Sequence, residues 1–369
     1  MSHHDLLAGI RAWVEIESQT ADRDGVNRVM SKAASDFAAF GAAVRRLPGR
    51  DGMGDHLSVT APWGGDGPGI LVLCHLDTVH PKGTLADHLP FRVDGDRAYG
   101  PGICDMKGGA YNALAAVRDL AQAKNHGLPV RLLYTSDEEV GSPTSRAIIE
   151  DMARQAKYVL VTEPARDGGK IVVARKGVGQ YTLTAHGRPS HAGARHEAGR
   201  NAIKEIARHV IAIEGMTDYA RGLTFNVGRI RGGTADNVVP AECTANIDVR
   251  ARSQADADWV DRYFRELKPH DPDVRLAVEG GPNRPPYERN PGVDMLFDKA
   301  KRVAADLGID LQGVSTGGGS DGNFTAHMVP TLDGLGVDGF GAHTLEEHIF
   351  VSSVEPRMRL MAGLLASLR

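Results

Sequence analysis

Short apolar runs, each followed by a polar side chain, are the clearest pattern in the chain. Three of them cover residues 70–74, 130–134 and 158–161. Uninterrupted runs of this length are typical of parallel strands that are buried on both faces. In an open α/β sheet the carboxyl ends of such strands form the edge at which ligands gather. We therefore expect a mostly parallel sheet flanked by helices, with a functional site at that edge.

The pattern changes in the middle of the chain, where apolar and polar positions alternate. We expect strands over residues 178–186, 223–230, 242–250 and 274–278, and helices over 199–213 and 255–267. Strand, helix, strand, strand, helix, strand is the ferredoxin-like order. Helices over 294–307 and 356–368 then return the chain to the first domain. The predicted domains are residues 1–176 together with 287–369, and an inserted α+β domain of residues 177–286.

Metal-compatible side chains follow the apolar runs or lie in glycine-rich loops. They are His75, Asp105, Glu139, Glu163 and His343. Zinc accepts imidazole nitrogen and carboxylate oxygen, and two zinc ions ~3.5 to 4 Å apart need a shared ligand. We expect Asp105 to be that ligand, because the glycines around it let the backbone approach a crowded site before a helix over residues 110–123. His75 and Glu163 would complete one metal site. Glu139 and His343 would complete the other.

Two further carboxylates lie beside the expected ligands. Glu138 directly precedes Glu139, and adjacent residues at the end of a strand can point in different directions. We expect Glu138 to act as the general base, which takes a proton from water and later passes it to the leaving amine. Asp77 lies two residues after His75, and its carboxylate would accept a hydrogen bond from the imidazole. Such a bond fixes the tautomer of a ligand histidine.

The motifs that contain these residues resemble those of a known family. They are residues 75–79 (HLDTV), 102–109 (GICDMKGG), 137–142 (DEEVGS), 163–164 (EP), 190–193 (SHAG), 237–240 (NVVP), 316–321 (TGGGSD) and 341–343 (GAH). In this order they resemble the dinuclear zinc metallopeptidases, which include glutamate carboxypeptidase, succinyl-diaminopimelate desuccinylase, the aminoacylases and the tripeptide peptidases. The resemblance spans nearly the whole chain and is nearest to glutamate carboxypeptidase. It implies a zinc exopeptidase-like catalytic domain with an inserted lid domain, which in many members also forms the dimer.

The resemblance also implies roles for residues outside the metal site. His191 would stabilise the oxyanion of the tetrahedral intermediate in the active site of the partner subunit. Asn237 and Arg250 would hold the carboxylate end of the substrate. Gly318 would lie against the substrate backbone. The peptide bond after Asp105 is expected to be cis.

Two cations give a first indication of the substrate. Lys170 and Arg284 resemble the positions that bind the glutamate carboxylates in the glutamate carboxypeptidases. Arginine offers a bidentate fork for a carboxylate and lysine a point charge, so together they favour an acidic C-terminal residue. Ordinary exposed cations are the alternative interpretation. Val172 departs from the polar residue that is expected near such a pocket.

We expect a metal-dependent hydrolase that cleaves an amide bond and releases a C-terminal, usually acidic, amino acid. A water molecule that bridges two divalent ions, zinc or else cobalt or manganese, would attack the carbonyl. One alternative is an N-acyl-amino-acid amidohydrolase, such as an aminoacylase or a desuccinylase. Another hydrolase of C–N bonds, including a deaminase, is a second alternative. A zinc-stabilised scaffold protein is a third, although such a protein is expected to lack a ligand or the base.

Composition restricts the partners and the compartment. The chain of 369 residues exceeds the usual size of one domain, and its net charge is −4. The lack of a basic excess argues against a nucleic-acid partner, and no apolar stretch approaches the ~20 residues that span a bilayer. The first ten residues do not resemble a signal peptide. We therefore expect a cytoplasmic homodimer that acts on a small peptide or N-acyl amino acid.

The remaining cysteines, histidines and acidic residues receive structural interpretations. The three cysteines form no CxxC pair and are expected to be buried thiols, not metal ligands. The other polar residues that we considered are expected to lie in surface turns. They are His80, His88, His186, His196, Glu346, Glu347 and His348.

Overall fold

The computed structural model describes residues 3–124 and 126–369, and the chain forms two compact units. Unit 1 comprises Met1–Ala174, Arg289–Thr316 and Ser320–Arg369, and unit 2 comprises Arg175–Glu288 and Gly317–Gly319. We predicted Gly317–Gly319 in the first domain, whereas they belong to unit 2. Nη1 of Arg175, also in unit 2, donates hydrogen bonds to the carbonyl oxygens of Gly318 and Gly319, at 3.1 and 3.2 Å.

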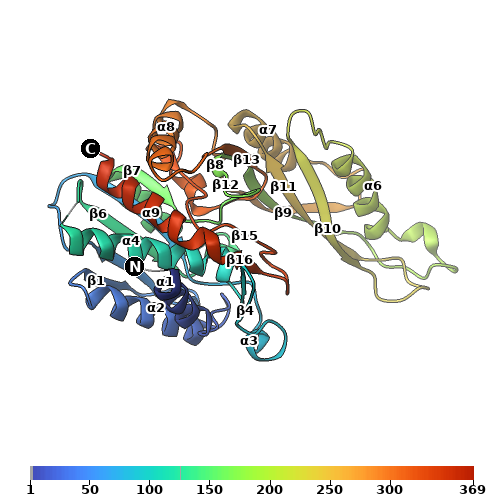
Figure 1. The fold of residues 1–369 in the computed structure, drawn as a ribbon. Helices are drawn as coiled ribbons and strands as arrows, with labels where there is room; N and C mark the ends of the chain where they lie inside the picture. Colours follow the sequence, from blue (N-terminus) through green and yellow to red (C-terminus); the bar gives the residue numbers. More distant parts are fainter. Residues whose placement is uncertain (1–2, 125) are drawn as a thin grey trace. The chain divides into compact units, whose positions relative to one another are not determined.

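The central sheet of unit 1 has six strands in the order β1-β2-β6-β3-β7-β14 (Figure 1). The strands are β1 (Ala43–Leu47), β2 (His56–Thr60), β3 (Gly69–His75), β6 (Val130–Thr135), β7 (Ala156–Val161) and β14 (Thr331–Leu332). β3 pairs in parallel with β6 and β7, and β14 pairs in parallel with β7. The three apolar runs form β3, β6 and β7, so the predicted parallel sheet is confirmed. The antiparallel edge formed by β1 and β2 was not predicted.

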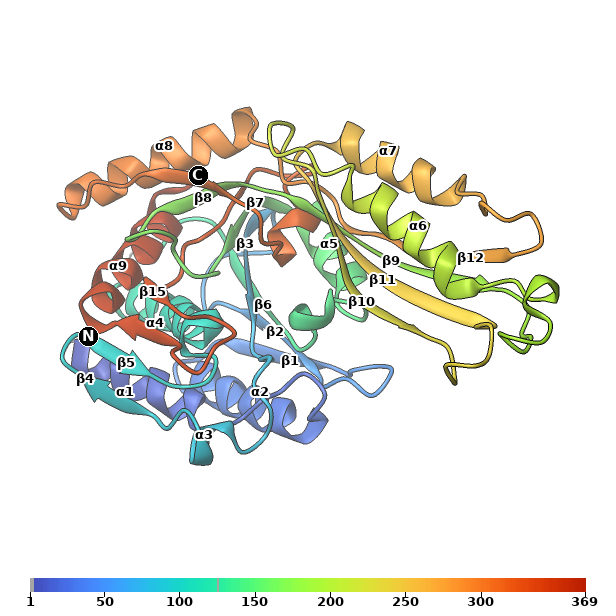
Figure 2. The same cartoon turned by 90° about the vertical axis from the view of Figure 1, so that its right-hand side faces the viewer.

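Helices cover both faces of this sheet. They are α1 (His3–Val14), α2 (Arg23–Ala38), α4 (Gly108–Ala123), α5 (Arg146–Arg154), α8 (Pro291–Asp306) and α9 (Val351–Ser367). A short helix, α3 (Thr84–Asp87), lies in the segment between β3 and β4 (Arg92–Asp94). On one face, the ring of Tyr134 lies 6.0 Å from that of Trp13 in α1 and 5.7 Å from that of Phe37 in α2. On the other face, Ile149 of α5 packs in one buried cluster with Leu73 of β3. Helices α4 and α9 lie side by side (Figures 1 and 2).

Two smaller sheets complete unit 1. One pairs β8 (Ile171–Arg175) with β13 (Gly313–Thr316), and the other has the order β15-β16-β5-β4. The strands of the second sheet are β4 (Arg92–Asp94), β5 (Arg97–Tyr99), β15 (Gly339–Phe340) and β16 (His348–Phe350). Pairing of β16 with β5 places the hairpin that contains His343 beside the segment that leads to Asp105.

Unit 2 contains one antiparallel sheet in the order β10-β11-β9-β12. Its elements are β9 (Gly177–His186), α6 (Ala202–Glu214), β10 (Thr224–Gly232), β11 (Glu242–Ala251), α7 (Gln254–Arg265) and β12 (Arg275–Arg284). Their succession is the predicted ferredoxin-like order, although β12 is longer than expected. Ile206 of α6 and Phe264 of α7 pack in one buried cluster with Leu183 of β9 and Ile247 of β11.

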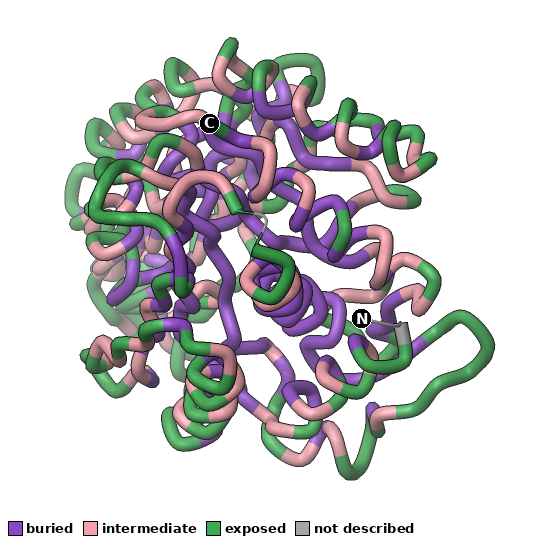
Figure 3. Tube along the Cα trace, turned by 60° about the vertical axis from the view of Figure 1, so that its left-hand side comes forward, coloured by how far each residue is buried: buried purple, intermediate pink, exposed green. Residues whose placement is uncertain are grey.

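Burial follows the strands and the inward sides of the helices, and exposed residues gather in the outer turns (Figure 3). Cys74, Cys104 and Cys243 are buried free thiols, as predicted. Among the described residues, no helix is both long and apolar enough to cross a membrane.

Candidate metal centre

Two groups of three potential ligands lie in unit 1, and they share Asp105. One group adds His75 and Glu163, and the other adds Glu139 and His343. In each group the ligand atoms lie within 4.8 Å of one another. Nε2 of His75 is 3.2 Å from Oδ1 of Asp105, whereas Nε2 of His343 is 3.4 Å from Oδ2. The two carboxylate oxygens of Asp105 therefore face different groups, as expected of a carboxylate that bridges two metal ions.

The ends of neighbouring strands bring the ligands together. β3 ends at His75, and Glu163 follows its parallel neighbour β7, so that Nε2 of His75 lies 3.8 Å from Oε1 of Glu163. Glu139 lies in the turn η2 (Glu138–Val140) that follows β6, and its Oε2 is 3.1 Å from Nε2 of His343. His343 has a φ of 66°. This left-handed conformation is uncommon for a residue other than glycine and is concentrated at functional sites.

Glycine permits a close backbone approach beside Asp105, which lies in the turn η1 (Ile103–Lys107). Helix α4 follows directly, and a Cβ atom on Gly109 would lie 2.1 Å from the carbonyl oxygen of Thr162. No larger residue fits there, so Gly109 lets η1 and α4 lie against the segment that carries Glu163. The Asp105–Met106 peptide bond is cis, which confirms the prediction.

Asp77 is fully buried and supports two segments of the centre. Nδ1 of His75 lies 2.9 Å from the Asp77 carbonyl oxygen and 3.5 Å from its carboxylate, so the backbone is the nearer partner. The carboxylate accepts hydrogen bonds from the backbone N–H groups of Glu138 and Glu139, both at 3.2 Å, and from the Thr20 hydroxyl at 2.8 Å. Asp77 therefore orients the imidazole and fixes the turn η2.

Glu347 lies in the interior, so its predicted place in a surface turn is wrong. Its side chain is 1% exposed, and its carboxylate accepts hydrogen bonds from the backbone N–H groups of residues 102, 104 and 105 at 2.8 to 2.9 Å. Oε2 of Glu347 also lies 2.6 Å from Nε2 of His80. Both His80 and His348 are buried as well, against the same prediction. Glu347 thus holds the turn that carries Asp105, and its neighbour Glu346 is exposed.

The charges of the centre explain its pKa shifts. Burial favours a higher pKa for Asp105, but hydrogen bonds from His343 and His75 hold that pKa well below its usual range. Hydrogen bonds to Asp105 and Glu139 raise the pKa of His343 to about 10. Burial opposes protonation of His75, yet Asp105 and Asp77 raise its pKa well above the usual value. Metal-free histidines of this kind hold protons that a cation would displace.

One buried oxygen atom tests whether a cation fits. Oε1 of Glu139 is buried and has no hydrogen-bond partner among the described residues. Burial also raises the pKa of Glu139. An orphaned carboxylate oxygen is costly unless a cation or water compensates it. The nitrogen and oxygen ligand set around it suits a divalent cation.

The fold and the site together define a class of protein. Two ligand groups that share a carboxylate, at the carboxyl ends of parallel strands, are typical of metal-dependent hydrolases with two ions. Glu138 adds a carboxylate on the turn η2 that belongs to neither ligand group.

The chain belongs to peptidase family M20/M25/M40, whose model matches residues 71–367. It is 33% identical over 377 residues to carboxypeptidase G2 from Pseudomonas sp. (strain RS-16), covering 98% of this chain and 89% of the relative. It is 29% identical over 307 residues to a succinyl-diaminopimelate desuccinylase from Verminephrobacter eiseniae (strain EF01-2), covering 78% and 75%. The crystal structure of aminopeptidase PepT from Bacillus cereus ATCC 10987 has a similar fold, with a TM-score of 0.80, 23% identity and coverage of 99% and 98%.

These findings confirm the family resemblance and show that the protein is an enzyme of the metallopeptidase and amidohydrolase type. The alternative of a scaffold protein without chemistry is rejected. All five expected ligands are brought together in unit 1, so the ligand set is intact.

His191 and Asn237 lie next to each other in unit 2, and both are exposed. The N–H of Ala192 donates to the carbonyl oxygen of Asn237 at 2.9 Å. Nδ1 of His191 accepts hydrogen bonds from the N–H groups of Gly193 and Ala194, both at 3.1 Å. An accepting nitrogen carries no proton, so the proton of the neutral ring is on Nε2. Nε2 of His191 is therefore a hydrogen-bond donor.

The other expected substrate residues are divided between the two units. Arg250 and Arg284 pair with Val178 of β9 from opposite sides, and both belong to unit 2 with Gly318. The Arg250 guanidinium forms a bidentate ion pair with Asp248 at 2.7 and 2.9 Å, so it already has a carboxylate partner. Arg284 is 5% exposed.

Lys170 belongs to unit 1, in the turn before β8, and its N–H donates to the carbonyl oxygen of Arg166 at 2.7 Å. Its side chain is half-buried. Val172, two residues further, is completely buried in β8. The expected pair for an acidic substrate, Lys170 and Arg284, thus combines one residue from each unit.

Proposed function

We propose that the protein hydrolyses an amide bond to release a C-terminal amino acid with an acidic side chain from a peptide or N-acyl conjugate. The observation that carries this proposal is the carboxylate of Asp105, which is shared by two ligand groups. The similarity to carboxypeptidase G2, at 33% identity over 98% of the chain, supports the release of a C-terminal residue.

Two divalent cations are the cofactors in this proposal, and we propose zinc. His75, Asp105 and Glu163 would hold one ion, and Asp105, Glu139 and His343 the other. Bound there, the ions would polarise the scissile carbonyl and lower the pKa of the attacking water. Cobalt and manganese suit the same nitrogen and oxygen donors.

Glu138 is the proposed general base and acid. Its backbone is fixed by the hydrogen bond from its N–H to Asp77, whereas its side chain is only partly buried. Glu138 takes a proton from the attacking water and delivers it to the nitrogen of the leaving amine. Asp77 contributes by holding the His75 imidazole and the turn η2 in position.

His191 is the proposed oxyanion donor. Its Nδ1 accepts two backbone hydrogen bonds, so Nε2–H is the group that can donate to a developing negative charge. We propose that it acts in the active site of a partner subunit of a homodimer.

Exposed apolar residues on unit 2 support a dimer that forms through this unit. β10 is an edge strand of the sheet, and Ile230 on it is 52% exposed. Ile211 on α6 is 76% exposed. Edge strands with exposed apolar side chains readily pair with another chain.

Arg284 and Lys170 are the proposed ligands for the carboxylates of the substrate. Asn237 would hold the carboxylate end, and Gly318 would lie against the substrate backbone. Arg250 is the weakest member of this set, because Asp248 already satisfies its guanidinium group.

Release of free amino acid from a panel of substrates tests the proposal. N-acyl and dipeptide conjugates of glutamate, aspartate, alanine and leucine are compared, with metal-loaded and chelated protein. We expect metal-dependent release with the largest kcat/KM for glutamate or aspartate conjugates. Arg284→Ala and Lys170→Ala should lower kcat/KM for these conjugates alone. Lys301→Ala is the control, because this exposed cation pairs with Asp298 on α8.

The other outcomes of the panel favour the alternatives. Release of neutral amino acids only would favour an N-acyl-amino-acid amidohydrolase, which the similarity to a desuccinylase also supports. If the metal-loaded protein hydrolyses neither the acidic nor the neutral conjugates, the result would favour another hydrolase of C–N bonds.

A further inference from the structure

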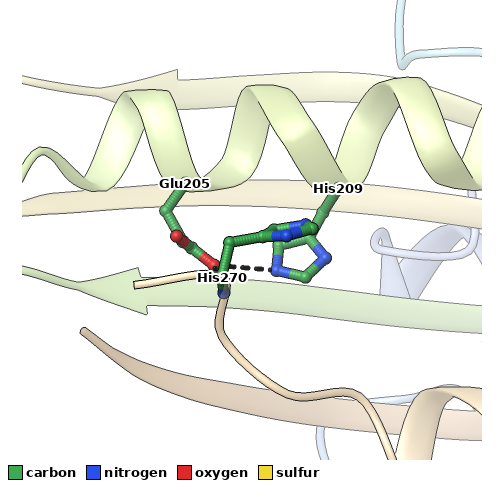
Figure 4. Close-up of side chains that lie close together, drawn as sticks. All are labelled: Glu205, His209 and His270. Carbon is green, nitrogen blue, oxygen red and sulfur yellow. Dashed lines mark hydrogen bonds and ion pairs between the residues drawn. The ribbon is translucent and has the colours of Figure 1, made fainter. Parts of the chain in front are cut away.

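A third group of potential metal ligands lies in unit 2, whereas the five ligands described above belong to unit 1. It consists of Glu205, His209 and His270, whose ligand atoms lie within 4.8 Å of one another. Figure 4 shows Glu205 and His209 projecting from the same side of α6 toward His270. His270 lies on the connection between α7 and β12.

Helical spacing and ring geometry make the three side chains converge. Glu205 and His209 are four residues apart on α6, which places them on one face of the helix. Oε1 of Glu205 lies 3.0 Å from Nε2 of His209. The rings of His209 and His270 are 4.6 Å apart between centroids and tilted by 41°. Two imidazoles and a carboxylate therefore border one small space.

Backbone hydrogen bonds hold the carboxylate in place. Oε1 of Glu205 accepts from the N–H of His270 at 2.6 Å, and Oε2 accepts from the N–H of Asp271 at 3.2 Å. These bonds explain why a carboxylate is buried at this point, but they do not require imidazoles on either side of it. Oε1 also forms a hydrogen bond with Nε2 of His209 at 3.0 Å. A carboxylate oxygen has two lone pairs, so Oε2 retains one beyond its backbone hydrogen bond.

The group has two buried members and one exposed member, as expected of a site that a cation can enter from solvent. Glu205 and His209 are each 2% exposed, whereas His270 is exposed. Buried polar groups of this kind are stabilised when they are paired or coordinate a metal. The imidazole of His270 is exposed, so it is accessible to an ion from solvent.

We propose that Glu205, His209 and His270 bind one Zn²⁺ ion, which ties α6 to the connection between α7 and β12. Zinc is commonly held by imidazole nitrogen and carboxylate oxygen in tetrahedral geometry, with water in an open fourth position. Two ligand atoms on one such ion lie about 3.3 to 3.6 Å apart, for bonds of about 2.0 to 2.2 Å. The 3.0 Å between His209 and Glu205 needs only a small adjustment to reach this separation. The ion would stabilise unit 2 and take no part in hydrolysis.

The amount of zinc bound by the full-length protein tests the proposal. Wild-type protein and variants are dialysed against a buffered micromolar concentration of free Zn²⁺, and the zinc content per chain is measured. We expect one more zinc ion per wild-type chain than per chain of the His270→Ala variant. Because the side chain of His270 is exposed, this substitution should not disturb folding. His186→Ala is the matched control. His186 lies on β9 of the same unit, 3.3 Å from the carboxylate of Glu242, and it belongs to none of the groups of potential metal ligands found among the described residues.

A second readout separates this ion from those of the catalytic centre. Zn²⁺ should raise the unfolding temperature of wild type and of His186→Ala more than that of His270→Ala, while all three keep the same hydrolytic activity. Equal zinc content in wild type and His270→Ala would overturn the proposal. The proposal would also be overturned if the additional ion bound only at millimolar zinc, because such an ion is an adventitious ion only.

Discussion

Potential metal ligands gather in two places, around Asp105 in unit 1 and around Glu205 in unit 2. Both places use imidazole and carboxylate donors, but the surrounding structure differs. In unit 1 the ligands come from segments that are far apart in sequence, and buried carboxylates hold the segments in place, Asp77 on one side and Glu347 on the other. In unit 2 two of the three ligands are one helical turn apart, and the carboxylate is held by two backbone N–H groups and by Nε2 of His209.

We propose that this difference distinguishes a centre for chemistry from a site that stabilises a fold. The donor types are the same in both, so they do not decide the role. The unit 1 centre adds a shared carboxylate, an oriented imidazole and a second carboxylate, Glu138, that is not a ligand. We therefore expect substitutions around the unit 1 centre to change turnover, and substitutions around the unit 2 group to change stability.

The largest effect is expected for Glu138→Gln, which removes the proposed base and leaves the proposed metal ligands in place. General acid–base catalysis contributes about 10²- to 10⁴-fold to rates, so kcat should fall by that factor. Steady-state kinetics together with metal analysis provide the measurement, and the metal content should stay as in wild type. Unchanged turnover would show that another group moves the proton.

A smaller loss is expected for His191→Ala. Removal of one donor from an oxyanion site costs about 10²- to 10³-fold in kcat. The metal content should not change, because His191 belongs to unit 2 and to no ligand group. His196→Ala, an exposed histidine of the same loop, is the control. Equal kcat values for both variants would remove His191 from the mechanism.

Glu347→Gln should weaken metal binding more than catalysis by the loaded enzyme. The substitution reduces the charge that holds three backbone N–H groups around Asp105. Loss of such a supporting partner typically lowers metal affinity about 10- to 100-fold. Competition with a chromogenic chelator measures the affinity, and Glu346→Gln is the control on the exposed neighbouring residue. Equal affinities would mean that the turn holds Asp105 without this carboxylate.

The smallest effect is the pH dependence of stability in the metal-free protein. Hydrogen bonds to Asp105 and Glu139 raise the pKa of His343 to about 10. A histidine whose pKa is higher in the folded protein than in the unfolded chain stabilises the fold. This stabilisation is complete at a pH below the pKa of ~6.5 in the unfolded chain, and it is lost as the pH rises through the pKa in the folded protein. Chelated protein should therefore become less stable from about pH 6.5 to 10. Thermal unfolding measures this trend, and metal-loaded protein, which binds neutral imidazole, should lack it. A trend of the opposite sign in chelated protein would contradict the pairing.

Sequence patterns predict the parts of this molecule that depend on local order. Apolar runs locate β3, β6 and β7, and three of the potential metal ligands lie at or after the ends of these strands, because the ends of parallel strands share an edge. The alternating pattern likewise locates the strands of unit 2. These inferences need only the period of the side chains and the direction of the strands.

Tertiary contacts explain what the sequence did not predict. Glu347 and Glu346 are identical side chains in one turn, and only the packing of the hairpin against η1 decides which is buried. The Glu205 group was missed because His270 is distant in sequence and joins α6 only in the folded unit. The carboxylate of Asp77 was expected to contact the His75 imidazole, but the nearest contact is made by the Asp77 backbone, which residue type does not reveal.

The most direct test of the shared role of Asp105 is an anomalous difference map from crystals of zinc-loaded protein, collected at the zinc absorption edge. We predict two peaks in unit 1, ~3.5 to 4 Å apart, each within about 2.0 to 2.2 Å of one carboxylate oxygen of Asp105. A single peak in unit 1, or two peaks that do not both contact Asp105, would contradict the assignment of a shared ligand and of the hydrolytic centre built on it.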